Sequence, residues 1–271
     1  SNPNLQQVPA RDEELSKLIR GLFLPEQDQK WYCIDYAQQE PRLLVHFASR
    51  LKLPESITAL SAYKTDEKTD FHTMVASMAG IKRKQAKTIN LGLFYGMGKK
   101  KLASQLGLEY EEAEKLFKKY HTRVPFVRGL YDRMLNYASK KGFVPTLLGR
   151  KRHFDLWEDA TDFGSMGHPL ERAKEIYKGK PLRRAYTHKA LNSLIQGSAA
   201  DVTKAAMLKV YEAGLLTPLL TVHDELDFSI PQDSKGLEQL KEIVHEMKNC
   251  VDLDLPLQVD VESGNDWGNI E

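Results

Sequence analysis

Cysteine is scarce in this chain. Only Cys33 and Cys250 occur among 271 residues, and they lack the spacing of a metal site. A disulfide framework or a zinc site is therefore not expected, and a reducing, cytoplasmic setting is favoured. Long apolar runs are also missing, because stretches such as 215–222 have only the length of a strand. A helix needs roughly 20 apolar residues to cross a bilayer, so no membrane role is expected.

Charge of one sign is not in excess either. The 39 basic residues are nearly balanced by 37 acidic ones, so the net charge of +2 neither favours nor excludes a nucleic acid as partner. The basic residues nevertheless cluster, at 82–84, 99–101, 118–119, 140–141, 150–152 and 183–184. Such clusters neutralise phosphates in nucleic-acid-binding proteins, although each taken alone is more typical of a solvated helix face.

The hydrophobic content of 41% suffices for the core of one large domain or two modest ones. Apolar periodicity predicts a short strand at 31–35, a helix over 38–51 and an all-helical block from 70 to about 137. Within this block, helices are expected at 71–78, 83–95, 111–120 and 125–140. Residues 155–183 are polar and carry several glycines and prolines, which predicts an elaborated loop with a short helix.

The last third of the chain predicts a long helix over 186–212, broken near Gln196-Gly197-Ser198. Two strands are expected at 219–223 and 226–230, with Asp224-Glu225 in the tight turn between them. A helix over 234–250 and an edge strand at 257–261 follow. The strands then form one small antiparallel sheet, split in sequence by the helical block, and we predict a mixed α+β fold.

Two aspartates lie at the ends of predicted strands. Asp35 follows the apolar run 31–34, and Asp224 follows 219–223. Carboxylates at strand ends of one sheet can converge on hard cations. Phosphoryl transfer uses two such cations, one to activate the attacking hydroxyl and one to neutralise the departing pyrophosphate. Taken singly, Asp35 is better explained as a helix N-cap, and the His223-Asp224-Glu225 triplet as a polar hairpin turn.

A stripe of side chains four residues apart runs down the predicted helix 83–95, and it consists of Arg83, Lys87, Leu91 and Tyr95. Two cations and an aromatic ring on one face suit a nucleoside triphosphate, with the cations on the phosphates and the ring near the base and sugar. Gly92 and Gly96 would let a template approach the helix closely. An exposed basic stripe that ends at a glycine C-cap explains the same pattern.

The whole chain resembles the C-terminal polymerase domain of family A DNA polymerases, and in part their bacteriophage members. Five ordered segments carry the resemblance: residues 1–11 before the palm, Asp35-Tyr-Ala-Gln-Gln-Glu-Pro-Arg42 as the first catalytic motif, 83–96 as the nucleotide-binding fingers helix, 192–201 as the minor-groove helix, and Val222-His-Asp-Glu225 as the second catalytic motif. The resemblance implies a palm at 1–64 and 189–271, with fingers at 65–188.

This resemblance also implies the chemistry of the site. Asp35, Asp224 and the carbonyl of Tyr36 would bind two Mg²⁺ ions, for which Mn²⁺ can substitute, and Glu225 would support them. Deoxynucleoside triphosphates would be the substrates. Arg83 and Lys87 would grip the triphosphate, with Lys87 as proton donor to the pyrophosphate.

Further residues of the nucleotide site follow from the same resemblance. His72 would assist on phosphate oxygens, and Gln38 and Leu91 would line the site. Glu40, partnered by Tyr95, would exclude a ribose 2′-hydroxyl and so select deoxynucleotides.

Primer-template DNA is the implied partner. Arg11, Asn192 and Gln196 would touch the minor groove near the primer end, and His223 and Gly96 would also contact DNA. Minor-groove acceptors vary little with sequence, which suits an enzyme that copies any sequence.

The chain departs from the family pattern at a few positions. Leu91 stands where Phe or Tyr is usual, which predicts altered nucleotide affinity and altered discrimination against dideoxynucleotides. Gln39 and Pro41 replace an apolar pair, although Pro is acceptable in the first turn of a helix. His188 stands where bacterial relatives often carry Arg, which affects one primer contact.

The family's thumb and exonuclease domains are not expected in this chain. We expect a separate N-terminal polypeptide with the thumb, and with any exonuclease, as a partner. A fragment, a split polymerase and an intein product all fit this expectation, in a bacterium or a phage-infected host cell.

Three rival functions remain. A catalytically retired polymerase-like subunit that binds DNA is opposed by the retained Asp35, Asp224, Arg83 and Lys87. A His-Asp metal phosphohydrolase would need further ligands on helices, and a related RNA polymerase is opposed by Glu40.

Overall fold

The computed structural model describes residues 8, 12–94, 99–162 and 164–271. The chain forms two compact units, one made of Ser1–Gln39 with Ala199–Glu271 and the other of Glu40–Ser198. We call them the sheet unit and the helical unit. The two ends of the chain therefore build one unit together, and the middle of the chain builds the other.

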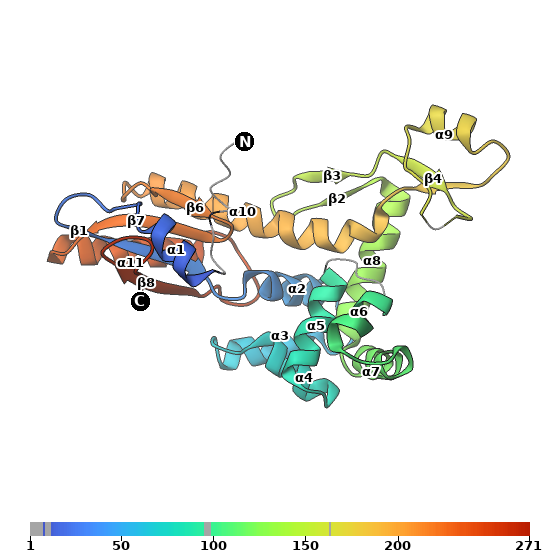
Figure 1. The fold of residues 1–271 in the computed structure, drawn as a ribbon, viewed down its shortest axis with the longest axis horizontal. Coiled ribbons are helices and arrows are strands. Elements are labelled where there is room, and N and C mark those ends of the chain that lie inside the picture. Colours follow the sequence, from blue (N-terminus) through green and yellow to red (C-terminus); the bar gives the residue numbers. More distant parts are fainter. Residues whose placement is uncertain (1–7, 9–11, 95–98, 163) are drawn as a thin grey trace. The chain divides into compact units, whose positions relative to one another are not determined.

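The sheet unit is organised around a four-stranded antiparallel sheet with the strand order β6-β7-β1-β8. These strands are β1 (Gln29–Tyr36), β6 (Leu220–Val222), β7 (Glu225–Pro231) and β8 (Val259–Gly264). Figure 1 shows blue β1 between orange and red strands from the other end of the chain. The central strand thus pairs on both sides with strands roughly 190 to 230 residues away in sequence, as the registers show.

One face of the sheet is an apolar core. Side chains alternate along a strand, so Tyr32, Ile34 and Tyr36 of β1 share this face with Leu226 and the next alternate residues of β7, and all are buried. Helix α11 (Ser234–Asn249) covers the core, because the Tyr36 hydroxyl donates to the carbonyl of Met247 at 2.7 Å. This contact anchors β1 from the face opposite to Asp35.

The other face carries a small aromatic cluster. Trp31 stacks on Trp267 with 6.3 Å between ring centroids, and Phe23 meets Trp267 edge-on at 5.3 Å. Arg20, the last residue of helix α1 (Glu13–Arg20), lies over the Trp267 ring at 4.4 Å. The acidic side chains of β1 and β7 lie on this same face.

The helical unit begins with α2 (Gln39–Arg50), whose first residue still belongs to the sheet unit. Its other helices are α3 (Ser56–Thr65), α4 (Phe71–Ala79), α5 (Arg83–Phe94), α6 (Lys99–Leu106), α7 (Tyr110–Arg123), α8 (Pro125–Lys141) and α9 (Leu170–Ile176). Local signals explain their limits: Asp70 caps α4 by accepting from the Thr73 N–H, Pro125 opens α8, and Gly142 ends α8 in the left-handed region at φ +78°.

Two short hairpins complete the helical unit. Strands β2 (Phe143–Pro145) and β3 (Lys151–His153) pair, as do β4 (Trp157–Asp159) and β5 (Leu182–Arg184), which enclose α9. A 3-10 turn, η2 (Thr187–Lys189), leads into the long helix α10 (Ala190–Glu212), which continues into the sheet unit.

The predicted α+β class, with an antiparallel sheet split in sequence by helices, is confirmed. The predicted break in the long helix is wrong, because α10 runs unbroken through Gly197. A Cβ at Gly197 would lie 2.6 Å from Thr146 Cγ2, so the glycine permits close packing and does not interrupt the helix. Neither α10 nor any other described helix has the length and apolarity to cross a membrane.

Further elements differ from the prediction. Glu225 is the first residue of β7 and not a turn residue, because its backbone continues the pairing with β1. The loop predicted at 155–183 contains the β4-β5 hairpin in addition to its helix. The β2-β3 hairpin, α1 and α3 were not predicted, since short strands and short helices carry little periodicity.

Candidate active site

Two sharp turns bring the predicted catalytic carboxylates together in the sheet unit. After Asp35, near the end of β1, the chain turns at Gln38, whose φ of +54° is left-handed. At the neighbouring β6-β7 turn, His223 is left-handed at +58°. Asp35 is paired in register with Glu225, and the Tyr36 N–H donates to the carbonyl of Asp224 at 3.4 Å. Asp35, Asp224 and Glu225 therefore meet at one corner of the sheet.

Burial dominates the electrostatics of this corner, and the neighbouring carboxylates act in addition on Asp35. The pKa of Asp35 is raised to about 7, first by burial and then by the negative charges of Asp224, Glu225 and Asp260. Burial likewise raises the pKa of Asp224. Half-buried carboxylates that are close together form the oxygen-rich donor set that hard divalent cations prefer. The residues present thus fit a magnesium site.

A second acidic position, Asp227, was missed in the sequence. It is fully buried and follows Glu225 on the same face of β7, and neither of its carboxylate oxygens has a hydrogen-bond partner among the described residues. Oxygen atoms of Glu225 and Asp227 and the sulfur of Cys33 lie within 4.8 Å of one another. Burial and the neighbouring charge of Asp227 raise the pKa of Glu225. The two-residue alternation in the run 225–227 could have revealed this neighbour of Glu225.

The predicted nucleotide-binding stripe lies in the helical unit, on α5. Arg83 and Lys87 are exposed and Leu91 is half-buried, whereas Ala86, Ile89 and Asn90 form the buried side of the helix. Within the described part of the stripe, Arg83 and Lys87 therefore lie on the exposed face of the helix, opposite the buried residues.

Hydrogen bonds organise the side chains around this stripe. Arg83 makes two 2.9 Å bonds to the Asp70 carboxylate at the start of α4. His72, two residues further on, accepts or donates at Nδ1 with the Asn90 amide at 3.0 Å. Asp70 and Asn90 were not singled out in the sequence, because their partners lie on another helix.

Other predicted residues lie on α2 and α10. In the first turn of α2, Glu40 is half-buried and Gln39 is buried, with its amide 3.5 Å from the Thr203 hydroxyl. On α10, Asn192 and Gln196 are one turn apart; Gln196 is exposed, and the buried Oδ1 of Asn192 has no partner among the described residues. Three predicted residues, Arg11, Tyr95 and Gly96, lie outside the described residues.

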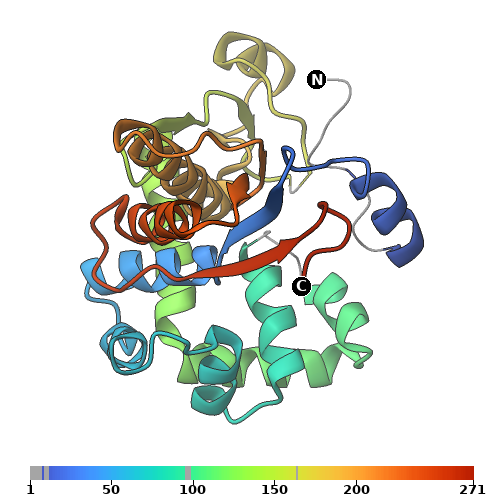
Figure 2. The same cartoon turned by 90° about the vertical axis from the view of Figure 1, so that its left-hand side faces the viewer.

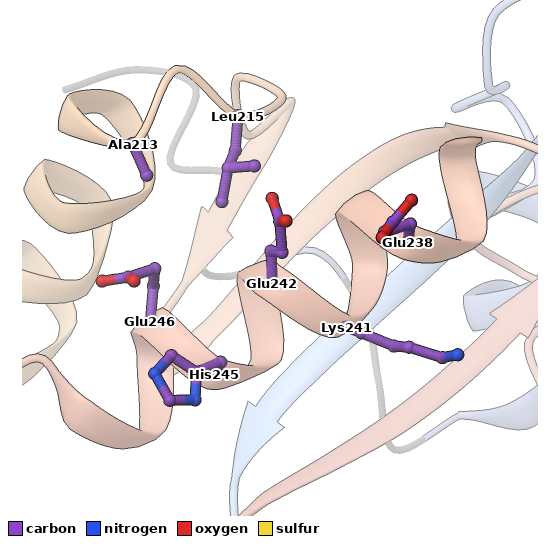
Figure 3. A pocket seen from close by; sticks show the side chains of 7 residues that line it. All are labelled: Ala213, Leu215, Glu238, Lys241, Glu242, His245 and Glu246. Carbon is purple, nitrogen blue, oxygen red and sulfur yellow. The ribbon is translucent and has the colours of Figure 1, made fainter.

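A pocket in the sheet unit is distinct from the carboxylate corner. It has a volume of about 410 Å³ and is lined by Ala213, Leu215, Glu238, Lys241, Glu242, His245 and Glu246 (Figure 3). Its polar side chains all come from α11, which covers the opposite face of the sheet from Asp35. With three glutamates on its wall, it is poorly suited to a polyanion such as DNA or a triphosphate.

The arrangement of strands is easiest to follow in Figure 2, where blue β1 and red β8 lie side by side. A similar fold occurs in a known structure. The POL domain of Pol1 from M. smegmatis, solved in complex with DNA primer-template and dNTP, superposes with a TM-score of 0.77 and 31% identity. The match covers 98% of this chain and 45% of that one.

Sequence relatives agree with the structural match. A DNA-directed DNA polymerase of Pseudomonas phage M6 is 37% identical over 309 residues, covering 99% of this chain and 42% of the relative. DNA polymerase I of Caldicellulosiruptor bescii is 35% identical over 283 residues, covering 98% of this chain and 30% of the relative. The chain thus spans less than half the length of these relatives. Since the model of DNA polymerase family A also matches residues 1–269, the chain belongs to DNA polymerase family A.

Proposed function

We propose that this chain carries the catalytic site of a template-directed DNA polymerase, which adds deoxynucleotides to a primer 3′-hydroxyl and releases pyrophosphate. The observation that carries the proposal is the meeting of Asp35 and Asp224 at one corner of the sheet, in a chain of this family. We assign 1–64 and 189–271 to the palm and 65–188 to the fingers.

The acidic corner supports a two-metal mechanism. Asp35, Asp224 and the carbonyl of Tyr36 would hold two Mg²⁺ ions, or Mn²⁺ in their place. When bound, such ions lower the pKa of the attacking hydroxyl and neutralise the charge on the leaving pyrophosphate. Glu225 shapes the corner from the strand opposite Asp35. Asp227 and Cys33 lie beside Glu225 on the same face of the sheet, with their ligand atoms within 4.8 Å of one another.

The exposed stripe on α5 is proposed to hold the substrate. Arg83 and Lys87 present two cations one helical turn apart, a spacing that suits neighbouring phosphates. Lys87 would deliver the proton to the departing pyrophosphate, and Leu91 and Gln38 would line the nucleotide site. Glu40 and Tyr95 would together exclude a 2′-hydroxyl by steric conflict.

The DNA is proposed to meet a second set of side chains. Asn192 and Gln196, one turn apart on α10, would contact the minor groove near the primer end, together with Arg11. His223 and Gly96 complete the proposed DNA contacts. The M6 polymerase and the Pol1 domain are both longer than this chain, and we propose that a preceding polypeptide with the thumb holds the duplex.

Primer extension tests the proposal. With Mg²⁺, a labelled primer-template and each nucleotide type, we expect extension with dNTPs and not with ribonucleotides. Asp35→Asn and Asp224→Asn should each reduce the rate by at least about 1000-fold, since each removes a charged metal ligand. Asp260→Asn is the matched control, because Asp260 lies opposite Asp35 on β8 but is exposed.

The outcome separates the candidate functions. If the chain requires a preceding segment for DNA binding, the same comparison is made with that segment added. Extension that survives the loss of either aspartate in a correctly folded variant would refute the proposed catalytic site. Tight DNA binding without extension in every form would favour the retired accessory subunit.

A further inference from the structure

A buried hydrogen-bond chain links three helices of the helical unit. Asn90 on α5 is 0% exposed and lies between Tyr120 of α7 and His72 of α4. The Tyr120 hydroxyl, itself fully buried, donates to Asn90 Oδ1, and Asn90 Nδ2 lies 3.0 Å from Nδ1 of His72. A buried asparagine must be bonded on both sides of its amide to avoid a desolvation cost, and here it is.

The Tyr120 hydroxyl and the Asn90 amide define the donor and acceptor roles in this row of hydrogen bonds. Burial raises the pKa of Tyr120, so its hydroxyl is neutral and has a proton to donate. Asn90 Oδ1 is its acceptor among the described residues, which orients the amide with its NH₂ group toward His72. An NH₂ group only donates, so His72 Nδ1 must accept. The neutral imidazole then carries its proton on Nε2.

We propose that Tyr120 and Asn90 are positioning residues that hold His72 as the Nε2–H tautomer, so that it offers one neutral N–H donor to a phosphate oxygen of the bound nucleotide. The ligand in this inference, a bound nucleotide, depends on the proposed function. The tautomer of His72 depends only on the three side chains.

The charges around the ring agree with a neutral donor. Burial lowers the pKa of His72 below its usual value, and the cations Arg83 and Lys87 lower it further, whereas Asp70 opposes them. The 3.0 Å contact with Asn90 places the ring beside α5. Protonation of Nδ1 would also turn an N–H toward the Asn90 NH₂ group and break the chain of bonds.

Selectivity follows from this arrangement. Arg83 and Lys87 supply charge to any polyanion, but an N–H donor at a fixed angle requires an acceptor at one place. A cationic histidine would keep the directed Nε2–H, but its charge would also attract a polyanion that is seated elsewhere. His72 therefore distinguishes a correctly seated triphosphate from one that is merely attracted.

The tautomer can be read directly by long-range ¹H–¹⁵N NMR on protein labelled at histidine, without substrate. We expect His72 to show an unprotonated Nδ1 and a protonated Nε2 at neutral and mildly alkaline pH. His121 is the internal control, because neither of its ring nitrogens has a partner among the described residues. An Nδ1–H tautomer, or an even mixture at His72, would overturn the proposal even if every variant failed to fold.

Two substitutions test whether Asn90 and Tyr120 set the tautomer of His72. Asn90→Asp has the same shape but accepts on both sides, so His72 should move its proton to Nδ1 or become cationic. Tyr120→Phe should leave the Asn90 amide free to reorient and mix the tautomers. An unchanged His72 spectrum in a folded Asn90→Asp protein would contradict the assignment.

The functional arm measures nucleotide incorporation. We expect His72→Phe to raise the KM for dNTP about tenfold, the effect of losing one good hydrogen bond, with a smaller change in kcat. Asn90→Asp should raise the KM similarly if its His72 spectrum shows the Nδ1–H tautomer, because Nε2 then has no proton to donate. Since the NMR result does not depend on activity, failure of the polymerase assignment and failure of this inference are distinguishable. The expected tautomer with unchanged KM in His72→Phe would refute the proposed phosphate contact.

Discussion

Asp70 and Arg83 form a bidentate ion pair that joins the start of α4 to the start of α5, with both nitrogen to oxygen distances at 2.9 Å. Asp70 also caps α4 through the Thr73 N–H at 2.7 Å. The Asp70 carboxylate thus caps the N-terminus of α4 and also pairs with Arg83, which we propose binds the triphosphate. The Arg83 side chain is 53% exposed, so a polyanion can reach it.

Substitutions at Asp70 separate its two roles. Asp70→Asn keeps a cap acceptor and loses the charge, whereas Asp70→Ala loses both, and we expect urea unfolding to show a further loss of about 1 kcal/mol in the alanine variant. Asp66→Asn is the control, because the Asp66 carboxylate accepts from the Lys68 N–H and does not cap a helix. Equal stabilities of the two Asp70 variants would contradict the capping role.

Acid should remove the contribution of the Asp70 charge to the stability of the folded protein. The Arg83 guanidinium holds the pKa of Asp70 well below its usual value. The folded-state pKa is depressed, so this stability is present above the unfolded pKa near 4 and is lost as the pH falls toward the folded pKa. The difference in free energy of unfolding between wild type and Asp70→Asn should therefore shrink below about pH 4. A difference that stays constant down to pH 2 would contradict this origin.

Asp35 should make the metal-free protein less stable in alkali. Because its folded pKa is raised to about 7 from the ordinary 3.8, the folded state binds this proton more tightly than the unfolded state does. Stability then falls as the pH rises between these two values. At pH 8 with chelator, we expect Asp35→Asn to be about 1–3 kcal/mol more stable than wild type, measured by urea unfolding.

Magnesium should reverse this difference, because it binds the carboxylates of the folded wild type. At pH 8 we expect Mg²⁺ to stabilise the wild type more than Asp35→Asn. Asp260→Asn, on the adjacent strand, should keep most of the magnesium effect. If Mg²⁺ raised the free energy of unfolding of wild type and Asp35→Asn equally, the corner would not be a cation site.

Leu91→Phe should change nucleotide selection. Leu91 is half-buried on the α5 stripe, so a larger ring can be accommodated there without entering the core. We expect the ratio of dideoxynucleotide to deoxynucleotide incorporation to change by about tenfold, the scale of one altered apolar contact. Lys84→Ala, exposed on the same helix but off the stripe, is the control. An unchanged ratio would refute a role for this position in sugar discrimination.

Gly197→Ala should destabilise the helical unit by packing conflict. Its Cβ would lie 2.6 Å from Thr146 Cγ2, and we expect a cost of about 1–3 kcal/mol in thermal or urea unfolding. Thr146→Ser removes the conflicting methyl group and keeps the hydroxyl. The double variant should therefore recover part of the loss, whereas additive losses would show that the conflict lies elsewhere.

Much of the fold could be predicted from sequence where the chain is strongly periodic. The α4, α5, α7 and α8 helices lie within a few residues of their predicted limits, because caps such as Asp70 and Gly142 mark them locally. Short elements were missed, and Gly197 was misinterpreted, since a glycine that permits close packing looks like one that ends a helix.

By itself, the sequence determined the α+β class, the exposed stripe on α5 and the family, because helical periodicity and the order of motifs are local properties of the chain. Only the tertiary structure decided that Asp35 lies opposite Glu225, that Asp227 is buried beside Glu225, and that Tyr120, Asn90 and His72 are joined by hydrogen bonds. These relationships join residues about 18 to 190 positions apart. Strand register and helix packing create them, and neither leaves a local signal in the amino-acid sequence.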